Sequence, residues 1–532
     1  MTGASPVYDA AIVGFGPVGA TLANLLTRAG LRIAVVEAAR EIYDKPRAIT
    51  LDHEVMRIFQ ACGLADKIAP FTTPHPGTDY LGVDGKIIKR FDPLPPPHPL
   101  GWPPTGTFLQ PEVERLLRAG IAGNAAADVF LGDAAVALQL SRETVALTLA
   151  DGRVLRARYA LGCDGANSFV RRELGIPLED LAFDEWWMVV DVRLTPPVEL
   201  PTKCVQYCWP SRPATFVIGP GNLRRWEIKM LRGETPEEFG RPENVKRLLA
   251  PFVDLESVEI WRSAVYRFHA LLAERWSEGR VYLLGDACHQ TPPFLGQGMC
   301  AGMRDASNFA WKLAAVLRDG ASERLLQTYE QERKPHVRAL VATAKEFGQI
   351  IGELDPAAAR QRDDRLRTEL EQGQAETIRQ RFIPDLAGGV IDRGPDAKVA
   401  GSLFVQPRVK SPDGAERLLD DVVSPHFLIV TGAARAQAWL TPASAEKWGR
   451  LRGERLIVRS SSRAPDPAMG AGMREFVETD GLLAEWLARH QAAAAVVRPD
   501  RYVFGLADSP DVLNRLVSDV YDHIFGTVRA IQ

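Results

Sequence analysis

Three glycines near the start of the chain have a spacing that brings the backbone close to a phosphate. Gly14, Gly16 and Gly19 form a G-x-G-x-x-G motif. Such glycines allow a tight turn, a close approach of a pyrophosphate and close packing of a helix on a strand. Glu37 follows eighteen residues after Gly19, where a carboxylate can accept hydrogen bonds from ribose hydroxyls and repel a 2′-phosphate. Three glycines alone could be an incidental turn, but with the acid they predict a cofactor that contains ADP.

The hydrophobic pattern predicts the elements that must position these residues. Residues 10–13 are apolar, residues 18–29 carry apolar side chains at helical spacing, and residues 31–36 form a second short apolar run. A nearly continuous apolar run is typical of a parallel strand that is buried on both faces. The order strand, glycine turn, helix and strand predicts a βαβ unit whose helix N-terminus faces the phosphates.

Two later segments place acidic residues directly after apolar runs. Asp164 follows the run 159–162, and Asp286 follows the run 281–284. After Asp286 the chain passes through two prolines and the glycine-rich sequence GQGM into a helix predicted over 304–317.

Both segments resemble the flavoprotein aromatic hydroxylases of the para-hydroxybenzoate hydroxylase type. The likeness is carried by GCDGANSFVRREL and by VYLLGDACHQTPPFLGQGMCAGMRDASNFAWKL. Within that class the chain is most similar to the 3-(3-hydroxyphenyl)propionate hydroxylases. That similarity is carried by KPRAITLDHEVMRIFQACGL, PLGWPP, FLQP, WWMVVDV, GQGMCAGMRDASNFAWKL and SLFVQPRV. These stretches are distributed over most of the chain.

The resemblance implies an α/β fold in three parts: a Rossmann-like FAD-binding domain, an inserted antiparallel-sheet substrate domain and a C-terminal thioredoxin-like domain. We expect the boundaries to be 1–72, 105–180 and 279–395 for the FAD-binding domain, 73–104 and 181–278 for the sheet domain, and 396–532 for the C-terminal domain. Seven prolines in residues 93–104 predict an extended crossing between domains. A charged helical zone is predicted over 323–381, and no cysteine follows Cys300, so the last domain cannot perform dithiol chemistry.

The resemblance also implies which residues contact the cofactor. Asp286 would bind the ribityl chain or the nearby pyrophosphate, and Arg47 and Gln110 would contact the phosphate and ribityl region. The backbone of Val136 would meet the adenine, and the Asp164 turn would link FAD binding with use of the nicotinamide donor.

The loop before the predicted helix also has a physical role towards a flavin. Reduced flavin is an anion, and the N–H groups at Gly296, Gly298 and Met299 could face its pyrimidine edge. Pro292 and Pro293 fix the backbone and remove donors, which helps to form a dry apolar wall where oxygen can react.

Each assignment has a simpler structural alternative. Asp286 could cap the following turn, Asp164 could only favour a turn, and Arg47 could be a solvated surface charge. A histidine such as His289 is more often a hydrogen-bonded structural residue than a base, so we assign it no chemistry.

The aromatic substrate would lie between the flavin and the antiparallel sheet. The candidate pocket residues are Pro293, Trp187, Tyr207, Arg212, Arg225, Tyr266 and His269. Aromatic residues on strands usually serve packing, so most of these candidates are expected in the core or on the surface. Either Arg212 or Arg225 would suit a substrate carboxylate, and the sequence does not choose between them. No residue is assigned as catalytic, because the chemistry is centred on the flavin.

The implied reaction is hydroxylation of a phenolic acid such as 3-(3-hydroxyphenyl)propionate, ortho to its hydroxyl. It would use NADH or NADPH and O2 and proceed through a flavin C4a-hydroperoxide. Three alternatives stay open: a hydroxylase of larger polycyclic phenols of the polyketide type, a flavin dehydrogenase without oxygen insertion, and a flavin-binding sensor without turnover. FAD would occupy the dinucleotide motif, so the nicotinamide donor would bind transiently elsewhere.

Composition and charge argue against other classes of protein. The 532 residues are 46% hydrophobic and 25% charged, which is typical of a globular chain of several domains. The 64 Lys and Arg residues against 67 Asp and Glu give a net charge of −3, so nucleic acid is not expected as a partner. No run of eighteen apolar residues and no signal peptide is evident, which predicts a cytoplasmic protein without a membrane partner. The irregularly spaced cysteines predict neither a disulfide framework nor a metal site, and the sequence leaves a homodimer open.

Overall fold

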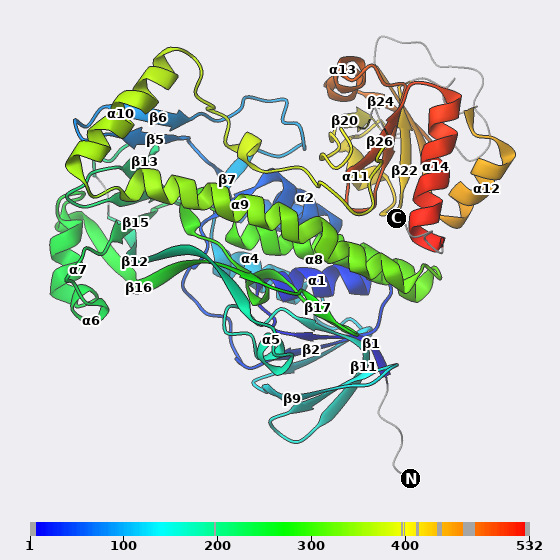
Figure 1. Cartoon of the computed structure of the whole chain (residues 1–532), viewed down its shortest axis with the longest axis horizontal. Coiled ribbons are helices and arrows are strands. Elements are labelled where there is room, and N and C mark those ends of the chain that lie inside the picture. The colour runs from blue at the N-terminus through cyan, green and yellow to red at the C-terminus, as the bar shows by residue number, and fades with distance from the viewer. Residues whose placement is uncertain are drawn as a thin grey trace.

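The computed structural model describes residues 7–195, 198–394, 397, 399–410, 414–432, 439–460 and 474–526. Within these ranges the strands form four sheets, of which three are large and one has three strands. Figure 1 shows the large sheets as separate layers, with the long helices α8 and α9 running between them. No helix in the described part of the chain is both long and apolar enough to cross a bilayer.

The first sheet contains the predicted βαβ unit. Its strands follow the order β17 (Ser277–Glu278), β18 (Val281–Leu283), β11 (Val154–Gly162), β1 (Val7–Val13), β2 (Ile33–Glu37) and β8 (Ala127–Leu131), with β9 (Ala135–Leu140) and β10 (Val145–Leu149) joined to β11. The strands β18, β11, β1, β2 and β8 pair in parallel, so their carboxyl ends meet at one edge of the sheet. The cofactor motifs lie at this edge.

Helices pack on the first sheet or on one another beside it. They are α1 (Pro17–Arg28), α2 (His53–Ala61), α3 (Ala65–Ile68), α4 (Gln110–Ala119), α5 (Phe169–Glu173), α8 (Gly298–Arg318) and α9 (Thr328–Gly352). A three-stranded sheet, β3 (Thr50–Asp52), β7 (Thr105–Phe108) and β4 (Thr72–Pro74), lies beside them. The sequence predicts this helix from residue 304, whereas α8 already starts at Gly298. It therefore directly continues the GQGM loop.

The second large sheet is mainly antiparallel, as its strand-forming composition predicts. Its order is β19 (His289–Gln290), β16 (Val258–Ala273), β12 (Leu178–Leu194), β15 (Leu223–Lys229), β14 (Ala214–Ile218), β13 (Cys204–Tyr207), β5 (Thr78–Leu81) and β6 (Ile87–Phe91). The helices α6 (Pro236–Phe239) and α7 (Pro242–Leu249) follow β15, and α10 (Pro356–Glu371) lies along β6 (Figure 1). The strands β5 and β6 precede β8–β11 of the first sheet in the chain, whereas β12–β16 follow them. Separate stretches of the chain therefore join in this one sheet.

The third sheet is mixed and lies in the C-terminal part. Its order is β21 (Glu416–Leu418), β20 (Arg408–Lys410), β24 (Arg474–Glu478), β23 (Glu454–Ser460), β22 (Leu428–Thr431), β25 (Ala494–Val497) and β26 (Val503–Ala507). Its helices are α11 (Leu419–Val422), α12 (Pro442–Arg450), α13 (Leu482–Arg489) and α14 (Pro510–Phe525). Separate apolar clusters lie on its two faces.

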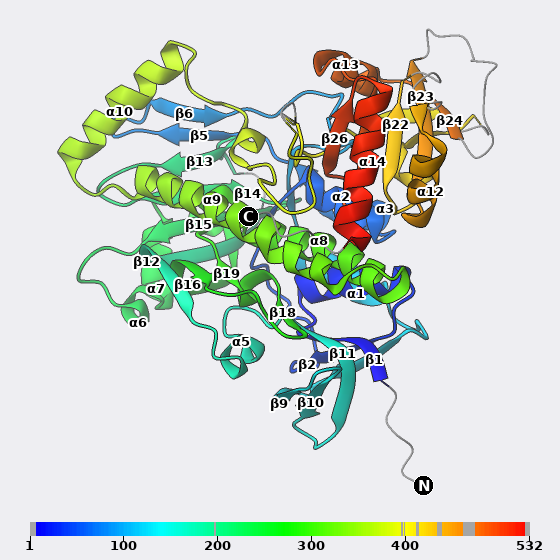
Figure 2. The ribbon, with the colours of Figure 1, turned by 45° about the vertical axis from the view of Figure 1, so that its right-hand side comes forward.

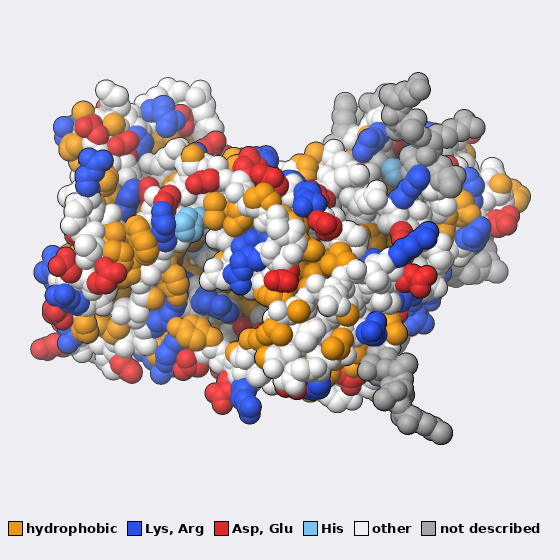
Figure 3. Space-filling view, turned by 60° about the horizontal axis from the view of Figure 1, so that its bottom comes forward, with side chains coloured by type: hydrophobic (Ala, Val, Ile, Leu, Met, Phe, Trp, Pro, Cys, Tyr) orange, Lys and Arg blue, Asp and Glu red, His pale blue; other side chains and the backbone are white. Residues whose placement is uncertain are grey.

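The C-terminal part packs against the first sheet's helices. Figure 2 shows its strands and α14 on the opposite side of the view from α10, and α11 contacts α2. The buried ion pair between Arg57 of α2 and Asp420 of α11 joins the two parts, with 2.6 Å between Nε and Oδ2. On the face seen in Figure 3, acidic and basic side chains alternate without a large patch of one sign, in line with the small net charge.

Candidate active site

A cavity of about 1240 Å³ lies between the first sheet and the antiparallel sheet. Its walls include Val13 and Glu37 from the first sheet and Gln206, Thr215 and Glu227 from the antiparallel sheet. Typical small-molecule pockets measure roughly 300–1,000 Å³, so this space can hold a dinucleotide and a second small molecule.

Most residues predicted to contact the cofactor line this one cavity. They are Gly14, Gly16, Glu37, Arg47, Gln110, Asp164, Asp286, Gly296, Gly298 and Met299. The other two do not belong to the cavity wall. A Cβ on Gly19 would lie 2.0 Å from the carbonyl oxygen of Gly14, so this glycine serves helix packing. Val136 on β9 is half-exposed, and its neighbours Ala134 and Ala135 line the cavity instead.

The phosphate end of the cavity is built by the turn between β1 and α1. Gly14 has a φ of +99°, and a Cβ there would lie 2.4 Å from the carbonyl oxygen of Cys163. A Cβ on Gly16 would meet no heavy atom within 4 Å, because the backbone faces open space at the start of α1. Glu37 ends β2 and accepts hydrogen bonds from the backbone N–H groups of Phe15 (2.7 Å) and Ala39 (2.9 Å). This turn fits an ADP pyrophosphate at a helix N-terminus.

The segment that carries Arg47 is held by the antiparallel sheet. Gln110 Oε1 accepts hydrogen bonds from the N–H groups of Arg47 (3.1 Å) and Ala48 (2.7 Å). Arg225 donates to the carbonyl oxygen of Arg47 (2.8 Å) and pairs with buried Asp191 at 2.7 Å. The guanidinium of Arg225 is therefore occupied, although its residue lines the cavity.

The opposite end of the cavity is formed by the turn at Asp286 and the GQGM loop. None of the described residues hydrogen-bonds the Asp286 carboxylate, which is accessible from the cavity, and desolvation by the surrounding walls raises its pKa. Gly296 has a φ of +59°, and a Cβ there would lie 2.2 Å from Thr50 Oγ1. The Gln297 side chain accepts a 2.8 Å hydrogen bond from Arg304, which fixes the loop from behind. The N–H groups at the start of α8 stay available to an anionic ring edge.

Asp164 caps its own turn. Its carboxylate accepts hydrogen bonds from Ser168 Oγ (2.5 Å) and from the N–H of Val170 (3.0 Å). Burial raises its pKa, although these hydrogen bonds lower it. The simpler role considered above is thus present in the structure, while the residue also lines the cavity.

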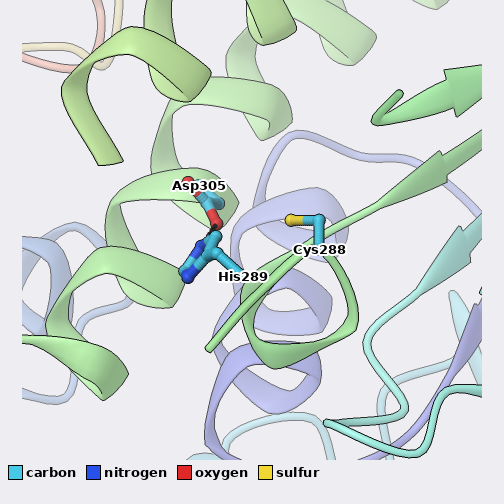
Figure 4. A group of neighbouring side chains, drawn as sticks. All are labelled: Cys288, His289 and Asp305. Atoms are coloured by element: carbon cyan, nitrogen blue, oxygen red, sulfur yellow. Dashed lines mark hydrogen bonds and ion pairs between the residues drawn. The ribbon is translucent and has the colours of Figure 1, made fainter. Parts of the chain in front are cut away.

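A buried group of three side chains lies behind the Asp286 turn and hydrogen-bonds its backbone. The imidazole of His289 and the carboxylate of Asp305 point towards each other with 2.7 Å between Nε2 and Oδ2, and Cys288 lies beside them (Figure 4). Asp305 also accepts hydrogen bonds from the N–H of Gly285 (3.0 Å) and from Arg333 (2.9 Å). Burial raises the pKa of the Cys288 thiol well above its usual value. The Asp305 carboxylate is already hydrogen-bonded and the Cys288 thiol is protonated. This group therefore suits structural support of the turn better than metal binding.

Three of the seven predicted pocket residues do not line the cavity. Pro293, Arg225, Tyr266 and His269 line the cavity, but Tyr207 and Arg212 do not. Side chains alternate along a strand, and it is Gln206 of β13 that faces the cavity.

The three residues outside the cavity wall have other partners. Tyr207 packs on Trp209 and Phe252 with ring centroids 4.7 and 5.0 Å away. Arg212 pairs with Glu234 at 2.8 Å. Trp187 is also absent from the wall and lies behind Phe294.

Sequence reasoning missed a polar row on the sheet wall and a cation at its edge. Gln206, Thr215 and Glu227 are paired neighbours on β13, β14 and β15. Thr215 donates to Gln206 Oε1 at 2.5 Å, whereas no described residue hydrogen-bonds Glu227. Arg379, which follows α10, also lines the cavity. Period-two alternation could have placed the three strand residues on one face, but nothing local marks Arg379.

Comparison with known protein families agrees with this geometry. Residues 7–344 match the model of the FAD binding domain, and residues 401–521 match the HcaD C-terminal domain. The chain belongs to the family of FAD-dependent aromatic hydroxylases. FAD is therefore the cofactor, and the enzyme is a monooxygenase of aromatic compounds.

Curated relatives of this hydroxylase match along nearly its whole length. A 3-(3-hydroxy-phenyl)propionate/3-hydroxycinnamic acid hydroxylase of Burkholderia cenocepacia (strain HI2424) is 37% identical over 513 residues, which cover 94% of each chain. One of Escherichia coli O81 (strain ED1a) is 33% identical and covers 96% of this chain and 94% of its own.

Solved structures share the fold of this hydroxylase. The flavin-dependent monooxygenase PieE, in complex with FAD and substrate, superposes with a TM-score of 0.76 at 21% identity, covering 97% of this chain and 99% of that one. Aklavinone-11 hydroxylase, with FAD and aklavinone, gives a TM-score of 0.74 at 22% identity with the same coverage.

Proposed function

We propose that this enzyme hydroxylates a phenolic acid such as 3-(3-hydroxyphenyl)propionate, ortho to its hydroxyl, with NADH or NADPH as the electron donor and O2 as the oxygen source. The observation that carries the proposal is the single cavity that joins the FAD motifs to a polar sheet wall. The names of the curated relatives support the substrate class. When bound, FAD supplies the redox chemistry and activates oxygen by the route that the family resemblance implies.

The chain's own residues would bind and orient the cofactor and the substrate, and they would exclude water from the site. The start of α1 would hold the pyrophosphate, and the N–H groups of Gly298 and Met299 would stabilise negative charge on the reduced ring. Phe294 lines the cavity and packs edge-on against Trp187, with 5.2 Å between ring centroids. Phe268 stacks on the same tryptophan at 6.1 Å. This apolar side would keep bulk water from the reacting oxygen.

Several broader features belong to the same proposal. We infer the three-domain division at the boundaries given above, with residues 396–532 as a thioredoxin-like domain without dithiol chemistry. A cytoplasmic location follows from the same sequence patterns, and a homodimer remains one of the assemblies to test. The predicted assignments of Arg47, Gln110, Val136 and Asp286 to parts of FAD are likewise proposals.

Product analysis with isotopically labelled O2 tests the proposed reaction. The FAD-loaded enzyme is mixed with NADH or NADPH and a panel of phenols that runs from 3-(3-hydroxyphenyl)propionate to polycyclic phenols. We expect the phenolic acid to accelerate NAD(P)H oxidation and to yield a catechol with one labelled oxygen. Product formation without label would support a dehydrogenase instead, and preference for fused rings would move the substrate class to polycyclic phenols.

A further inference from the structure

Arg379 is a cation at the point where the GQGM loop meets the edge of the antiparallel sheet. It opens the short 3-10 turn Arg379–Phe382 after α10 and lines the cavity. Its Nη2 donates to the carbonyl oxygen of Leu295 and lies 2.7 Å from where a Cβ of Gly296 would be. The charge is therefore held beside the loop that serves the flavin ring.

The guanidinium of Arg379 lacks an acidic partner in the described part of the chain. Its Nε is buried and has no hydrogen-bond partner, and no carboxylate oxygen of a described residue lies within 4.0 Å. The fully buried arginines near the cavity are paired, as Arg225 is with Asp191 and Arg304 with Asp52. Burial lowers the pKa of Arg379. A partly buried cation without an acidic partner is costly, and a ligand anion would offset that cost.

The groups next to Arg379 on the wall are hydrogen-bond donors. Burial, with the charge of Arg379, lowers the pKa of His75 to about 3, so its imidazole is neutral. The Nδ1 of His75 accepts a 3.1 Å hydrogen bond from the N–H of Gly77, which leaves the proton on Nε2. Burial raises the pKa of Tyr80, whose hydroxyl stays protonated. Both residues line the cavity beside the cation.

The one acidic side chain of the polar row lies further along the wall. Glu227 is on β15, and the strands β14 and β13 separate it from β5, which carries Tyr80. Neighbouring strands are about 4.8 Å apart, so three steps separate the two backbones by roughly 14 Å. The edge near Arg379 is thus cationic and rich in donors.

We propose that Arg379, with His75 and Tyr80 as neighbouring donors, binds an anionic oxygen of the aromatic substrate, either its carboxylate or its phenolate. The inference rests on the proposed function and makes it more specific. A guanidinium presents several N–H groups in a plane that matches an oxyanion, which gives selectivity as well as affinity.

Binding to FAD-loaded protein without NAD(P)H tests this role apart from turnover. Three probes are titrated through the change in flavin absorbance: 3-(3-hydroxyphenyl)propionate, its amide, and 3-phenylpropionate. In Arg379→Met we expect roughly tenfold or greater loss of affinity for the probes that carry the contacted oxygen. Loss for the two carboxylates with the amide unchanged identifies the carboxylate. Loss for the two phenols with 3-phenylpropionate unchanged identifies the phenolate.

Control variants separate selectivity from general damage. Arg212→Met removes an arginine between β13 and β14 that does not line the cavity, and it should change none of the three affinities. Arg379→Lys should retain part of the selectivity, because it keeps the charge and loses the planar fork. Equal loss for all three probes, loss of FAD alone, or no loss in Arg379→Met would overturn the inference.

The outcome is also distinguishable from failure of the proposed function. A wild-type enzyme that binds the probes but forms no hydroxylated product would contradict the proposed reaction while the ligand selectivity stays measurable. A wild-type enzyme that binds none of the three probes would contradict both.

Discussion

Tyr502 of the C-terminal part donates a 2.7 Å hydrogen bond to Oε1 of Glu54 on α2. The other carboxylate oxygen of Glu54 accepts from Arg304 of α8, and Arg304 also donates to Gln297 at 2.8 Å. All four side chains are buried. The C-terminal part therefore reaches the GQGM loop through three consecutive hydrogen bonds.

Tyr502→Phe tests this connection, because it removes only the first hydrogen bond. Burial raises the pKa of Tyr502 well above its usual value, so the hydroxyl is a donor over the accessible pH range. A hydrogen bond to a charged acceptor contributes about 1.5–3 kcal/mol, and we expect the free energy of unfolding to fall by that amount. We also expect a shift in the flavin reduction potential, measured by anaerobic dye titration.

The matched control is Tyr521→Phe in the same part of the chain. The Tyr521 hydroxyl accepts a 2.6 Å hydrogen bond from Arg450 near the surface and is not part of the hydrogen-bonded series from Tyr502 to Gln297. An identical flavin potential in Tyr502→Phe and the wild type would show that the C-terminal part stabilises the fold without influencing the loop.

Gly296→Ala tests the close approach at the GQGM loop. A Cβ at this position would lie 2.2 Å from Thr50 Oγ1 and 2.7 Å from Arg379 Nη2, and the φ of +59° is strained for alanine. Gly175→Ala is the matched control, because its φ is +60° and its Cβ would meet nothing within 4 Å. The backbone strain of about 1–2 kcal/mol is common to both variants. We expect Gly296→Ala to lose more stability in thermal unfolding and to bind FAD more weakly, and equal losses would contradict the clash.

The sequence predicted the cofactor end of the site because local chemistry determines it. A glycine turn between Val13 and α1 and an acid at the end of β2 are required by phosphate and ribose wherever this unit occurs. The apolar runs that predicted β1, β2 and β18 correspond to strands in the structure.

The substrate wall could not be predicted in the same way, because it depends on pairing between distant segments. From the sequence, Tyr207 and Gln206 are equally plausible as cavity residues. Only the register of β13 in the sheet shows which of them faces the cavity. Arg212 is excluded by Glu234, a partner 22 residues away. Arg379 lies in a stretch predicted only as a charged helical zone, and the fold alone brings it to the cavity.

Glu227→Gln tests the electrostatics of the polar row. Burial raises the pKa of Glu227, although Arg225 at 3.9 Å lowers it. A raised pKa in the folded state means that Glu227 favours folding at low pH and that this contribution is lost as the pH rises through its folded pKa. We therefore expect Glu227→Gln to be more stable than the wild type at neutral pH. The difference should vanish below the unfolded pKa of the group, as measured by thermal unfolding at a series of pH values.

Glu234→Gln should show the opposite sign. Although burial alone would raise the pKa of Glu234, the hydrogen bonds from Arg212 and from the Leu231 N–H lower it. Its contribution to stability is therefore present at neutral pH and is lost as the pH falls. If Glu227→Gln and Glu234→Gln changed stability in the same direction at neutral pH, the assigned environment of Glu227 would be wrong.

Asp286→Ala separates the stability of the apoprotein from retention of FAD. The surrounding cavity walls raise the pKa of Asp286 although its side chain is accessible to the open cavity, and no described residue hydrogen-bonds its carboxylate, so we expect it to add no stability to the apoprotein at neutral pH. We expect the variant apoprotein to unfold at the same temperature as the wild type or higher, while it loses FAD on dilution or gel filtration. Asp305→Asn behaves differently, because it leaves buried Arg333 without its charged partner and should cost the apoprotein about 3–5 kcal/mol. Full FAD occupancy in Asp286→Ala would show that this carboxylate faces the cavity without binding the cofactor.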